Sequence, residues 1–478
     1  MNEKILSKSE VFARYPAYDR AAVRGALRDA LHGFREKIVV LDDDPTGTQT
    51  VHGVYVLTDW EPESVMDAFR APESMFFILT NSRSMTREET ASAHEKIARV
   101  VCAASEQTGI PFLLISRSDS TLRGHYPLET QTLARALEDA MGARIDGEII
   151  LPFFEEGGRY TVDDIHYVAS GDAMVPAAMT EFARDKTFGY QSSNLREWVV
   201  EKHGEGSPQD VSSISLDRLR ARDYGAICGV LFELIGMRAV FVNALSYADV
   251  EVFATALIRS IAEGKRFVIR SAAALTKVLG GIPDKPLLSR AELADAGNDK
   301  GGLIIAGSHV KRTTEQLAYL RASGAYEYVE LDQRLALDEA ALRAETERVT
   351  RMAEECIWTG KNVIVATRRE RFDLGTGRAE DELKLAVRIS TAITDVVAGL
   401  TVRPGFIIAK GGITSSEIGV KALRVKKALV LGHILPGVPV WRTGPESRFP
   451  NLKYVIFPGN VGGQDALLEA VKKLEQKG

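Results

Sequence analysis

Short apolar runs alternate with longer amphipathic stretches along most of this chain. The runs are continuous, as is typical of strands that are covered on both faces, and the stretches between them predict helices. This order predicts an α/β fold with mostly parallel sheets flanked by helices. The expected strands are Ile38–Leu41, Met75–Leu79, Phe112–Ser116, Gly147–Leu151, Val240–Val242, Phe267–Ile269, Leu303–Ala306, Val363–Ala366, Phe406–Ala409, Ala428–Leu431 and Tyr454–Phe457.

Three helix starts are expected from the spacing of a capping box, in which Thr precedes Glu or Gln by three residues. They are Thr86 with Glu89, Thr313 with Gln316 and Thr414 with Glu417. In the first 36 residues, apolar side chains recur every four positions at Val23, Leu27 and Leu31, and Gly33 is a plausible stop. We therefore expect a helical N-terminal extension at residues 1–36.

The two series of strands are separated by residues 281–302, which are rich in Gly, Pro, Asp and Lys. Such a composition is typical of a linker. The sequence predicts one domain at residues 37–280 and another at 303–478, which agrees with the size prior for a chain of 478 residues.

Composition narrows the class of protein. The 60 basic and 65 acidic residues give a net charge of −5, so no basic surplus indicates a nucleic-acid partner. The three cysteines are far apart, and the eight histidines lack the spacing of a zinc site, so we predict no residue as a protein-built metal ligand. No apolar run is long enough to span a membrane. These features favour a cytoplasmic enzyme.

The first strand is followed by three adjacent carboxylates, Asp42, Asp43 and Asp44, and then by the hydroxyl of Thr46. Ligands bind at the carboxyl ends of strands in open α/β sheets, and neighbouring carboxylates need a counter-charge, a metal or a proton. One alternative is a solvated turn. Another is a haloacid dehalogenase-like phosphatase, since Asp42-x-Asp44-x-Thr46 has the spacing of its nucleophile loop.

The loops after the next two expected strands carry arginines, hydroxyls and a further acid. Arginine can hold a carboxylate through two hydrogen bonds, and an ionised Asp can accept an alcohol proton. Such loops suit a small polyhydroxylated anion, although helix caps with salt bridges remain an alternative. The candidate residues are Ser82, Arg83, Asp119, Ser120, Thr121 and Arg123.

Three glycine-rich turns follow strands of the second half, where backbone N–H groups could bind phosphates. Neither a P-loop nor a Rossmann fingerprint is present in the sequence. Glycine-rich turns are common between strands and helices, so a single one would mean little. Three such turns in one domain favour a common phosphate ligand. The candidate residues are Ser308, Gly411, Gly412, Ile413, Thr414, Ser415, Gly459, Asn460 and Gly462.

Seven motifs in order resemble the four-carbon acid sugar kinase family, which was long catalogued as a domain of unknown function. They are D-D-P-T-G at 43–47, N-S-R-S at 81–84, D-S-T-L-R-G at 119–124, P-F-F-E-E-G-G-R at 152–159, G-G-I-T-S at 411–415, P-G-V-P at 436–439 and P-G-N-V-G at 458–462. The resemblance covers nearly the whole chain.

This resemblance implies an ATP-dependent kinase that phosphorylates the terminal hydroxyl of a four-carbon acid sugar such as threonate, erythronate or 3-oxo-tetronate. It implies a substrate domain and a nucleotide domain with the active site in the cleft between them, and Mg²⁺ bridging the ATP phosphates. One of Asp43, Asp44 and Asp119 would take the proton, and Arg83 or Arg123 would bind the substrate carboxylate. A non-catalytic sensor of sugar acid or nucleotide stays an alternative, and a homo-oligomer is compatible with the sequence.

The stretch at residues 159–205 departs from the pattern of shorter family members, because it is longer and more polar. We expect it to shape the substrate pocket. A particular substrate therefore cannot be carried over from shorter relatives.

Overall fold

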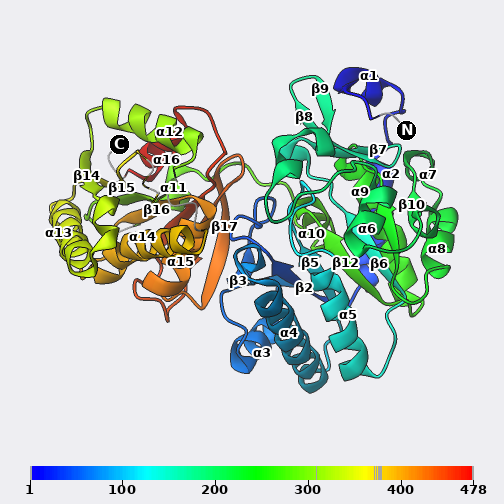
Figure 1. Ribbon diagram of the computed structural model, residues 1–478. Coiled ribbons are helices and arrows are strands. Elements are labelled where there is room, and N and C mark those ends of the chain that lie inside the picture. The colour runs from blue at the N-terminus through cyan, green and yellow to red at the C-terminus, as the bar shows by residue number, and fades with distance from the viewer. Residues whose placement is uncertain are drawn as a thin grey trace. The chain divides into compact units, whose positions relative to one another are not determined.

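The protein folds into two compact units (Figure 1). The computed structural model describes residues 3–475 apart from residues 296, 308, 371, 373 and 375–378. Unit 1 comprises Met1–Val51 and Asp59–Asp284, and unit 2 comprises His52–Thr58 and Lys285–Gly478. A short segment from the first half of the chain therefore belongs to unit 2.

The main sheet of unit 1 is parallel throughout and has the strand order β10-β11-β6-β12-β5-β2-β4. Its apolar strands are almost wholly buried because helices cover the sheet, as the continuous apolar runs predict. The strands are β2 (Lys37–Asp42), β4 (Met75–Leu79), β5 (Phe112–Arg117), β6 (Gly147–Leu151), β10 (Ser212–Ile214), β11 (Arg238–Val242) and β12 (Phe267–Ser271).

The helices of unit 1 confirm two of the expected helix boundaries. Helix α4 begins with the capping box of Thr86 and Glu89, and α2 ends at Gly33. Helix α2 buries Val23 and packs on α9. The helices are α1 (Lys8–Ala13), α2 (Arg20–Gly33), α3 (Pro62–Arg70), α4 (Arg87–Thr108), α5 (Leu128–Met141), α6 (Leu195–His203), α7 (Leu216–Arg220), α8 (Tyr224–Phe232), α9 (Tyr247–Ala262) and α10 (Ala273–Leu279).

The long middle segment forms a second, antiparallel sheet that the apolar pattern did not predict. Its order is β1 (Leu6–Ser7), β9 (Ala173–Pro176), β8 (Ile165–Ser170) and β7 (Arg159–Val162). Short 3-10 helices follow, η3 (Ala177–Met179) and η4 (Glu181–Arg184); the others in unit 1 are η1 (Ser82–Ser84), η2 (Glu155–Gly157) and η5 (Pro208–Asp210). The N-terminal residues thus pair with the middle segment.

The sheet of unit 2 mixes parallel and antiparallel strands in the order β3-β17-β18-β19-β16-β13-β15-β14. Strand β3, missing from the predicted series, pairs antiparallel with β17. The run at Ala428–Leu431 was expected to be covered on both faces, which is wrong, because β17 alternates buried and half-buried positions. The strands are β3 (Val54–Leu57), β13 (Leu303–Ala306), β14 (Glu327–Leu331), β15 (Val363–Thr367), β16 (Phe406–Lys410), β17 (Lys427–Leu435), β18 (Val438–Thr443) and β19 (Lys453–Phe457).

Two expected capping boxes in unit 2 are wrong. Thr313 lies inside the first turn of α12, and the Gln316 amide is buried and donates to the backbone oxygens of Val461 and Gly463 instead (3.0 and 2.7 Å). Thr414 lies inside α15, which begins after Gly411. In both cases a tertiary contact or a glycine turn sets the start of the helix.

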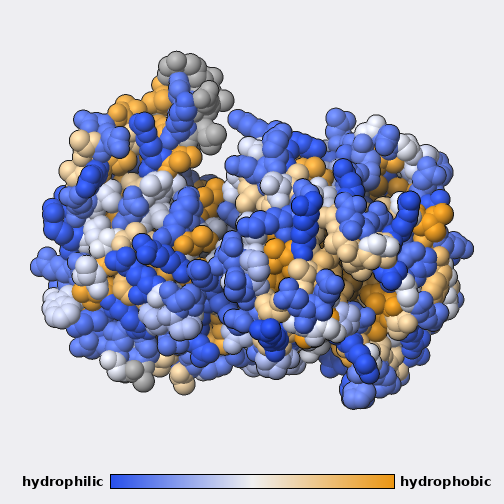
Figure 2. Space-filling view, turned by 90° about the horizontal axis from the view of Figure 1, so that it is seen from below, coloured by the Kyte–Doolittle hydropathy of each residue, from blue (hydrophilic) through white to orange (hydrophobic). Residues whose placement is uncertain are grey.

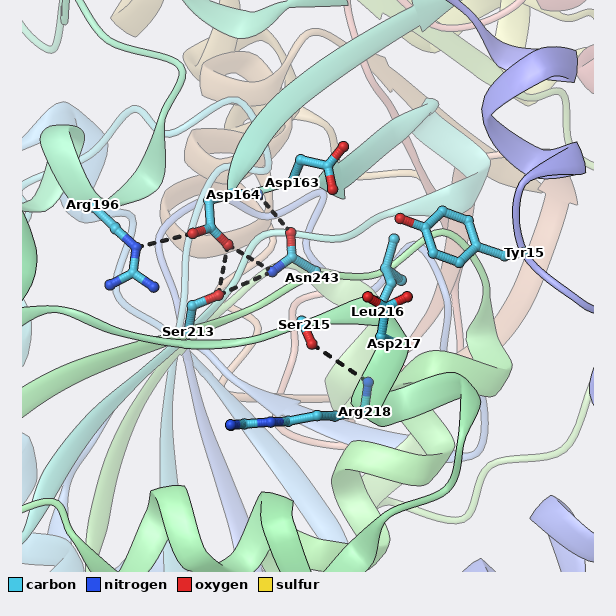
Figure 3. Close-up of a pocket in the computed structure, with 10 residues that line it drawn as sticks. All are labelled: Tyr15, Asp163, Asp164, Arg196, Ser213, Ser215, Leu216, Asp217, Arg218 and Asn243. Atoms are coloured by element: carbon cyan, nitrogen blue, oxygen red, sulfur yellow. Dashed lines mark hydrogen bonds and ion pairs between the residues drawn. The ribbon is translucent and has the colours of Figure 1, made fainter. Parts of the chain in front are cut away.

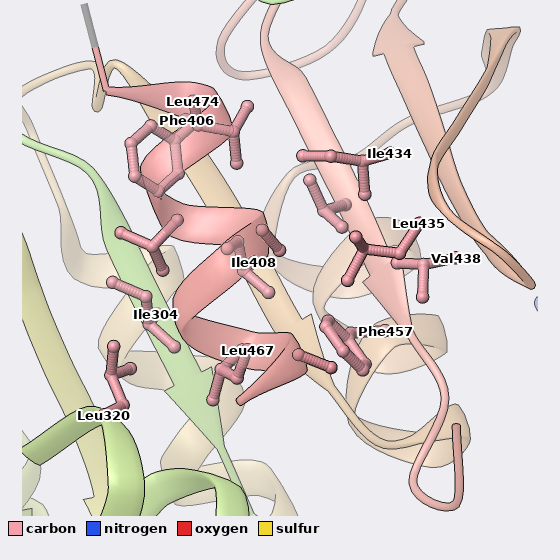
Figure 4. Close-up of a cluster of buried hydrophobic side chains, with 14 of the residues drawn as sticks. Ile304, Leu320, Phe406, Ile408, Ile434, Leu435, Val438, Phe457, Leu467 and Leu474 are labelled. Atoms are coloured by element: carbon pink, nitrogen blue, oxygen red, sulfur yellow. The ribbon is translucent and has the colours of Figure 1, made fainter. Parts of the chain in front are cut away.

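Helix α16 covers one face of the unit 2 sheet and closes a core of aliphatic and phenyl side chains (Figure 4). The helices of this unit are α11 (Arg290–Leu293), α12 (Lys311–Ala322), α13 (Glu339–Trp358), α14 (Ala379–Gly399), α15 (Gly412–Glu417) and α16 (Ala466–Leu474), with η6 (Gln333–Leu337) and the π-helical η7 (Ile418–Ala422). The core residues that Figure 4 labels are Ile304, Leu320, Phe406, Ile408, Ile434, Leu435, Val438, Phe457, Leu467 and Leu474.

The outer surface is mainly hydrophilic on the face shown in Figure 2, where apolar residues lie singly or in small groups. Among the described residues, none of the helices combines the length and the apolar character that a membrane span needs.

Candidate functional site

The three polar loops predicted in unit 1 meet at one edge of its sheet. Strand β2 lies between β4 and β5 in the same parallel sheet, so their carboxyl ends are neighbours. The Thr80 N–H donates to the backbone oxygen of Asp42 (2.9 Å), and the Asp43 N–H donates to that of Arg117 (3.2 Å). These bonds tie the loops together directly after the strands.

The Arg83 guanidinium is the centre of this cluster. Its Nε lies 3.1 Å from Asp43 Oδ2, its Nη2 lies 2.6 Å from Asp44 Oδ2, and its Nη1 lies 3.8 Å from Asp119 Oδ1. All three predicted catalytic carboxylates therefore surround one cation. Asp43, Asp44 and Asp119 also raise the pKa of Arg83 against the opposing effect of its burial.

Asp42 is buried beneath the cluster and is paired with Arg117, whose Nη1 lies 3.2 Å from Asp42 Oδ1. A Cβ at Gly47 would fall within 1.8 Å of the same carboxylate, so the turn packs directly on it. Burial raises the pKa of Asp42 to about 6, although Arg117 acts in the opposite direction. Because the Asp42 carboxylate accepts a hydrogen bond from Arg117 and packs directly against the turn at Gly47, it is poorly placed to attack a phosphate, which argues against the phosphatase alternative.

Asp43 is the least satisfied acid of the cluster. Its side chain is 3% exposed, and among the described residues neither carboxylate oxygen has a hydrogen-bond partner. Asp43 forms ion pairs with Arg83 and Arg117, but the N–H groups of these arginines are not aligned to donate hydrogen bonds to its oxygens. Burial raises its pKa to about 7, with the two arginines opposing and Glu129 reinforcing the shift. Asp43 can therefore exchange a proton near neutral pH.

Asp44 and Asp119 stay ionised, in contrast to Asp43. Burial acts to raise the pKa of both. Arg83 together with the hydrogen bonds from Thr46 to Asp44, and together with Arg123 and the Thr121 hydroxyl at Asp119, outweighs burial, so both pKa values lie below the usual range. Asp44 also accepts from the N–H and hydroxyl of Thr46. Asp119 accepts from Arg123 Nε (2.8 Å) and from the Thr121 hydroxyl. Both acids are ion-paired with arginine in this arrangement.

The predicted hydroxyl groups hold side chains within the cluster. Ser82 directly precedes Arg83 in the chain, and its hydroxyl donates to Oε1 of the buried Glu129 (2.6 Å). Ser120 is buried, and its backbone oxygen lies 2.8 Å from His166 Nε2 of the middle segment. The Tyr190 hydroxyl donates to the backbone oxygen of Thr121 (2.9 Å). The middle segment thus contacts the loop that carries Asp119.

Two buried charged residues of this region were missed by the sequence analysis. Arg270 donates through Nη2 to the Arg123 backbone oxygen (3.0 Å), and its guanidinium carbon lies 5.3 and 5.1 Å from the centres of the Tyr126 and Trp198 rings, which stack on each other. Glu129 lies in the first turn of α5. The available signal for Arg270 was a charge at the end of an otherwise apolar strand.

The glycine-rich turns of unit 2 also lie side by side. They follow β13, β16 and β19, which are neighbours in the sheet. The Gly411 N–H donates to the Phe457 backbone oxygen (2.8 Å), and a Cβ at Gly307 would lie 3.2 Å from the Thr414 hydroxyl. The structure therefore brings together the predicted turns, except that Ser308 lies outside the described residues.

Lys410 joins two of these turns and was missed by the sequence analysis. Its ammonium group is buried, donates to the backbone oxygens of Pro458 and Gly459, and lies 4.1 Å from the centre of the Phe457 ring. Burial lowers its pKa to about 7. Its signal in the sequence was a lysine directly before two glycines.

The turn at Gly411 has a backbone conformation that requires glycine. Gly411 has φ +112°, a conformation that side chains disfavour, and Gly462 has φ +85° in the third turn. The Ser415 hydroxyl donates to the Gly411 backbone oxygen, and Ile413 is 60% exposed beside it. Asn460 is exposed in the third turn, next to Gly459.

A separate polar cavity of about 370 Å³ lies elsewhere in unit 1 (Figure 3). None of the predicted site residues lines it. Its carboxylate Asp164 is already satisfied by Arg196 Nε (2.9 Å), the Ser213 hydroxyl (2.6 Å) and the Asn243 amide (3.0 Å). Asp163 and Asp164 have positive φ because they form the turn between β7 and β8. This network stabilises a hairpin.

No group of three or more potential metal ligands is present among the described residues. The carboxylates of unit 1 are instead neutralised by arginine. A hydrated Mg²⁺ held by one carboxylate and by substrate phosphates would not require such a group.

Comparison with known proteins assigns both halves of the chain. Residues 38–279 match the family model described as the sugar-binding N-terminal domain, and residues 303–467 match the nucleotide-binding C-terminal domain. The chain is 26% identical over 414 residues to a D-threonate kinase of Cupriavidus necator, covering 82% of this chain and 85% of that protein.

Two solved structures share the fold. One, from Salmonella typhimurium LT2 and provisionally described as a tRNA synthase, has a TM-score of 0.66 at 16% identity and covers 92% of this chain and 99% of its own. The other is Haemophilus influenzae protein HI1011, of the family DUF1537, with a TM-score of 0.62 at 16% identity, 91% of this chain and 100% of its own. They confirm the predicted α/β architecture. Since the matched models span most of the sequence, the chain belongs to the four-carbon acid sugar kinase family.

Proposed function

We propose that this protein is an ATP-dependent kinase that phosphorylates the terminal hydroxyl of a four-carbon acid sugar of the threonate, erythronate or 3-oxo-tetronate type. The family assignment and the similarity to a D-threonate kinase support this class of substrate. The composition favours action in the cytoplasm. The observation that carries the mechanism is the buried Asp43 carboxylate, which has no hydrogen-bond partner among the described residues and lies beside arginines.

Asp43 is the general base in this proposal. A base with a pKa near 7 combines a useful fraction of the deprotonated form with a real driving force for taking the proton. Gly124 has φ +121°, and a Cβ there would lie 3.6 Å from Asp43 Oδ2. In this proposal the substrate hydroxyl reaches the covered carboxylate from the side of Gly124, where no side chain intervenes.

Arg83 orients the base and neutralises the charge that collects around it. It holds Asp43 and Asp44 together, so two acids coexist beside an incoming anion. Phosphoryl transfer depends mainly on positioning and on charge neutralisation, which is what this cluster provides.

The turns of unit 2 would bind ATP through backbone N–H groups. Lys410 fixes the turn at Gly411 to that at Gly459, so both turns are held before the nucleotide arrives. Mg²⁺ would neutralise the phosphate oxygens, and Asp44, partly exposed and ionised, has the carboxylate chemistry that a hydrated Mg²⁺ prefers.

The test is an assay of ADP formation with purified protein, ATP, Mg²⁺ and the stereoisomers of threonate, erythronate and 3-oxo-tetronate. We expect turnover with at least one acid and a product phosphorylated at the terminal carbon by NMR. ATP binding by folded protein without turnover on any of these acids would contradict the proposal. Hydrolysis of a generic phosphomonoester, with phosphate trapped on Asp42, would favour the phosphatase instead.

A further inference from the structure

Arg159 differs from Arg83 and Arg123 because it has no carboxylate within 4 Å among the described residues. Arg83 lies within 4 Å of three carboxylates, and Arg123 is paired with Asp119 and approaches Asp185 (3.7 Å). Among the described residues, Arg159 makes no ion pair within that distance and no side-chain hydrogen bond. Its Nε is buried, and the residue as a whole is half-buried.

The backbone around Arg159 is held in a defined turn. Arg159 and Phe154 exchange two backbone hydrogen bonds of 2.8 and 3.1 Å. Gly157 lies inside the turn, where a Cβ would fall within 2.5 Å of the Phe154 ring and 3.3 Å of Arg159 Nη1. The motif P-F-F-E-E-G-G-R therefore builds a turn whose last residue is a preorganised cation.

The middle segment sets the position of this cation relative to Arg123. The guanidinium carbons of Arg123 and Arg159 lie 5.1 and 5.4 Å from the centre of the same Phe182 ring. Burial lowers the pKa of Arg159, Arg123 lowers it further, and Asp119 acts against both. Two guanidinium groups thus lie around one aromatic ring, with Asp119 acting on both and Asp185 close to Arg123.

We propose that Arg159 is the residue that binds the carboxylate of the substrate, held beside Arg123 by the Phe182 ring. This inference rests on the proposed function, in which the substrate is a sugar acid. A planar guanidinium presents paired N–H donors that match a carboxylate, and an unpaired one gains most from such a ligand. Arg83 loses its candidacy for this role because its donors already face three acids.

This assignment separates the two ends of the substrate. Arg159 and Arg123 would hold the carboxylate end on the middle segment, and Asp43 would meet the hydroxyl end. The distance between the arginines and Asp43 would then determine the length of substrate that fits. The middle segment, through Phe182, becomes the element that selects acids over neutral alcohols.

The test compares Arg159→Met with Arg184→Met, since Arg184 is an exposed arginine of the same segment, at the end of η4. Steady-state kinetics would be measured with the best four-carbon acid and with the matching neutral tetritol. We expect Arg159→Met to raise KM for the acid roughly 10- to 100-fold. The KM for ATP and the kcat/KM for the tetritol should not change, and Arg184→Met should behave as the wild type.

Two further variants separate binding from structure. Arg159→Lys keeps the charge but loses the paired donors, so it should recover part of the affinity. Phe182→Leu should raise KM for the acid by roughly 2- to 5-fold, the usual worth of a cation–π contact. A wild-type KM in Arg159→Met, or an equal loss for acid and tetritol, would overturn the proposal.

Thermal shifts with each acid distinguish this inference from the proposed function. If an acid stabilises the wild type without being phosphorylated, the kinase proposal fails, but loss of that stabilisation in Arg159→Met would still support the anion site. If no four-carbon acid stabilises the protein or is turned over, the Arg159 assignment fails as well.

Discussion

The two predicted binding regions use different parts of the polypeptide. In unit 1 the chemistry lies in charged side chains, with Arg83 surrounded by Asp43, Asp44 and Asp119. In unit 2 the predicted binding groups are the backbone N–H groups of glycine turns, two of which are joined by hydrogen bonds from the Lys410 ammonium group. A region built of side chains can set a pKa and select among ligands, whereas backbone N–H groups bind phosphate regardless of what it is attached to.

The comparison predicts that substitutions in the two regions will fail in different ways. Unit 1 variants should affect the chemical step or the acid, and unit 2 variants should affect the nucleotide. A variant of one region that shows the signature of the other would contradict this division.

The largest effect is expected for Asp43→Asn, which keeps the size of the side chain and removes the base. We expect kcat to fall roughly 100- to 10,000-fold, the usual contribution of a positioned base. Binding of ATP should be unchanged. The measurement is steady-state kinetics together with nucleotide titration, and Asp67→Asn, at an exposed position of α3, is the matched control. Near-normal kcat would exclude Asp43 and return Asp119 as a candidate.

A pH profile gives the next largest effect. As a general base, Asp43 must be deprotonated to act. Because its pKa is raised to about 7, activity should fall about tenfold per pH unit below that value. The same shift means that the folded state binds the proton more tightly than the unfolded chain between about pH 4 and pH 7. Its contribution to stability is therefore full below pH 4 and is lost as pH rises through 7.

The measurements are kcat/KM and urea unfolding across pH 5 to 9, with Asp43→Asn as the control. In this variant the free energy of unfolding should no longer show the part of its decrease between pH 5 and pH 7 that Asp43 causes. Lys410 acts in the opposite direction, since its lowered pKa of about 7 makes stability rise between about pH 7 and pH 10. An unchanged stability profile in Asp43→Asn would show that other groups dominate.

The smallest of these effects is expected for Gly411→Ala. At φ +112° a side chain is strained by roughly 1–3 kcal/mol, and the turn that faces the nucleotide would shift. We expect the KM for ATP to rise by about 3- to 10-fold with little change in the KM for the acid. Gly25→Ala, in the middle of α2 with nothing within 4 Å, is the control and should stabilise the helix slightly. An effect on the acid alone would contradict the division between the regions.

Much of the fold could be predicted from apolar runs, because strands buried on both faces consist mostly of apolar residues. All strands of the unit 1 sheet except the short edge strand β10 follow from that pattern, as do the acidic loops of unit 1 and the glycine-rich loops of unit 2. The antiparallel hairpins of the middle segment did not, because their strands are short and only partly buried. Strand β3 was missed because its partner β17 is far away in the sequence.

The sequence predicted which residues form the candidate site, but not which role each of them has. The letters of D-D-D-P-T-G do not distinguish three adjacent acids, since each has the same pKa before folding. Burial and the directions of Arg83, Arg117 and Arg123 separate them: Asp42 is paired, Asp43 is left without donors, and Asp44 stays ionised.

The sequence alone determined which residue types follow which strands, and therefore the class of ligand that we propose for each region. Local order is enough for this, because the carboxyl ends of parallel strands always meet at one edge. The tertiary structure decided which acid carries a shifted pKa, that Lys410 joins two turns, and that Arg159 is left without a counter-ion. Those properties depend on burial and on distances between segments remote in the sequence, which no local pattern encodes.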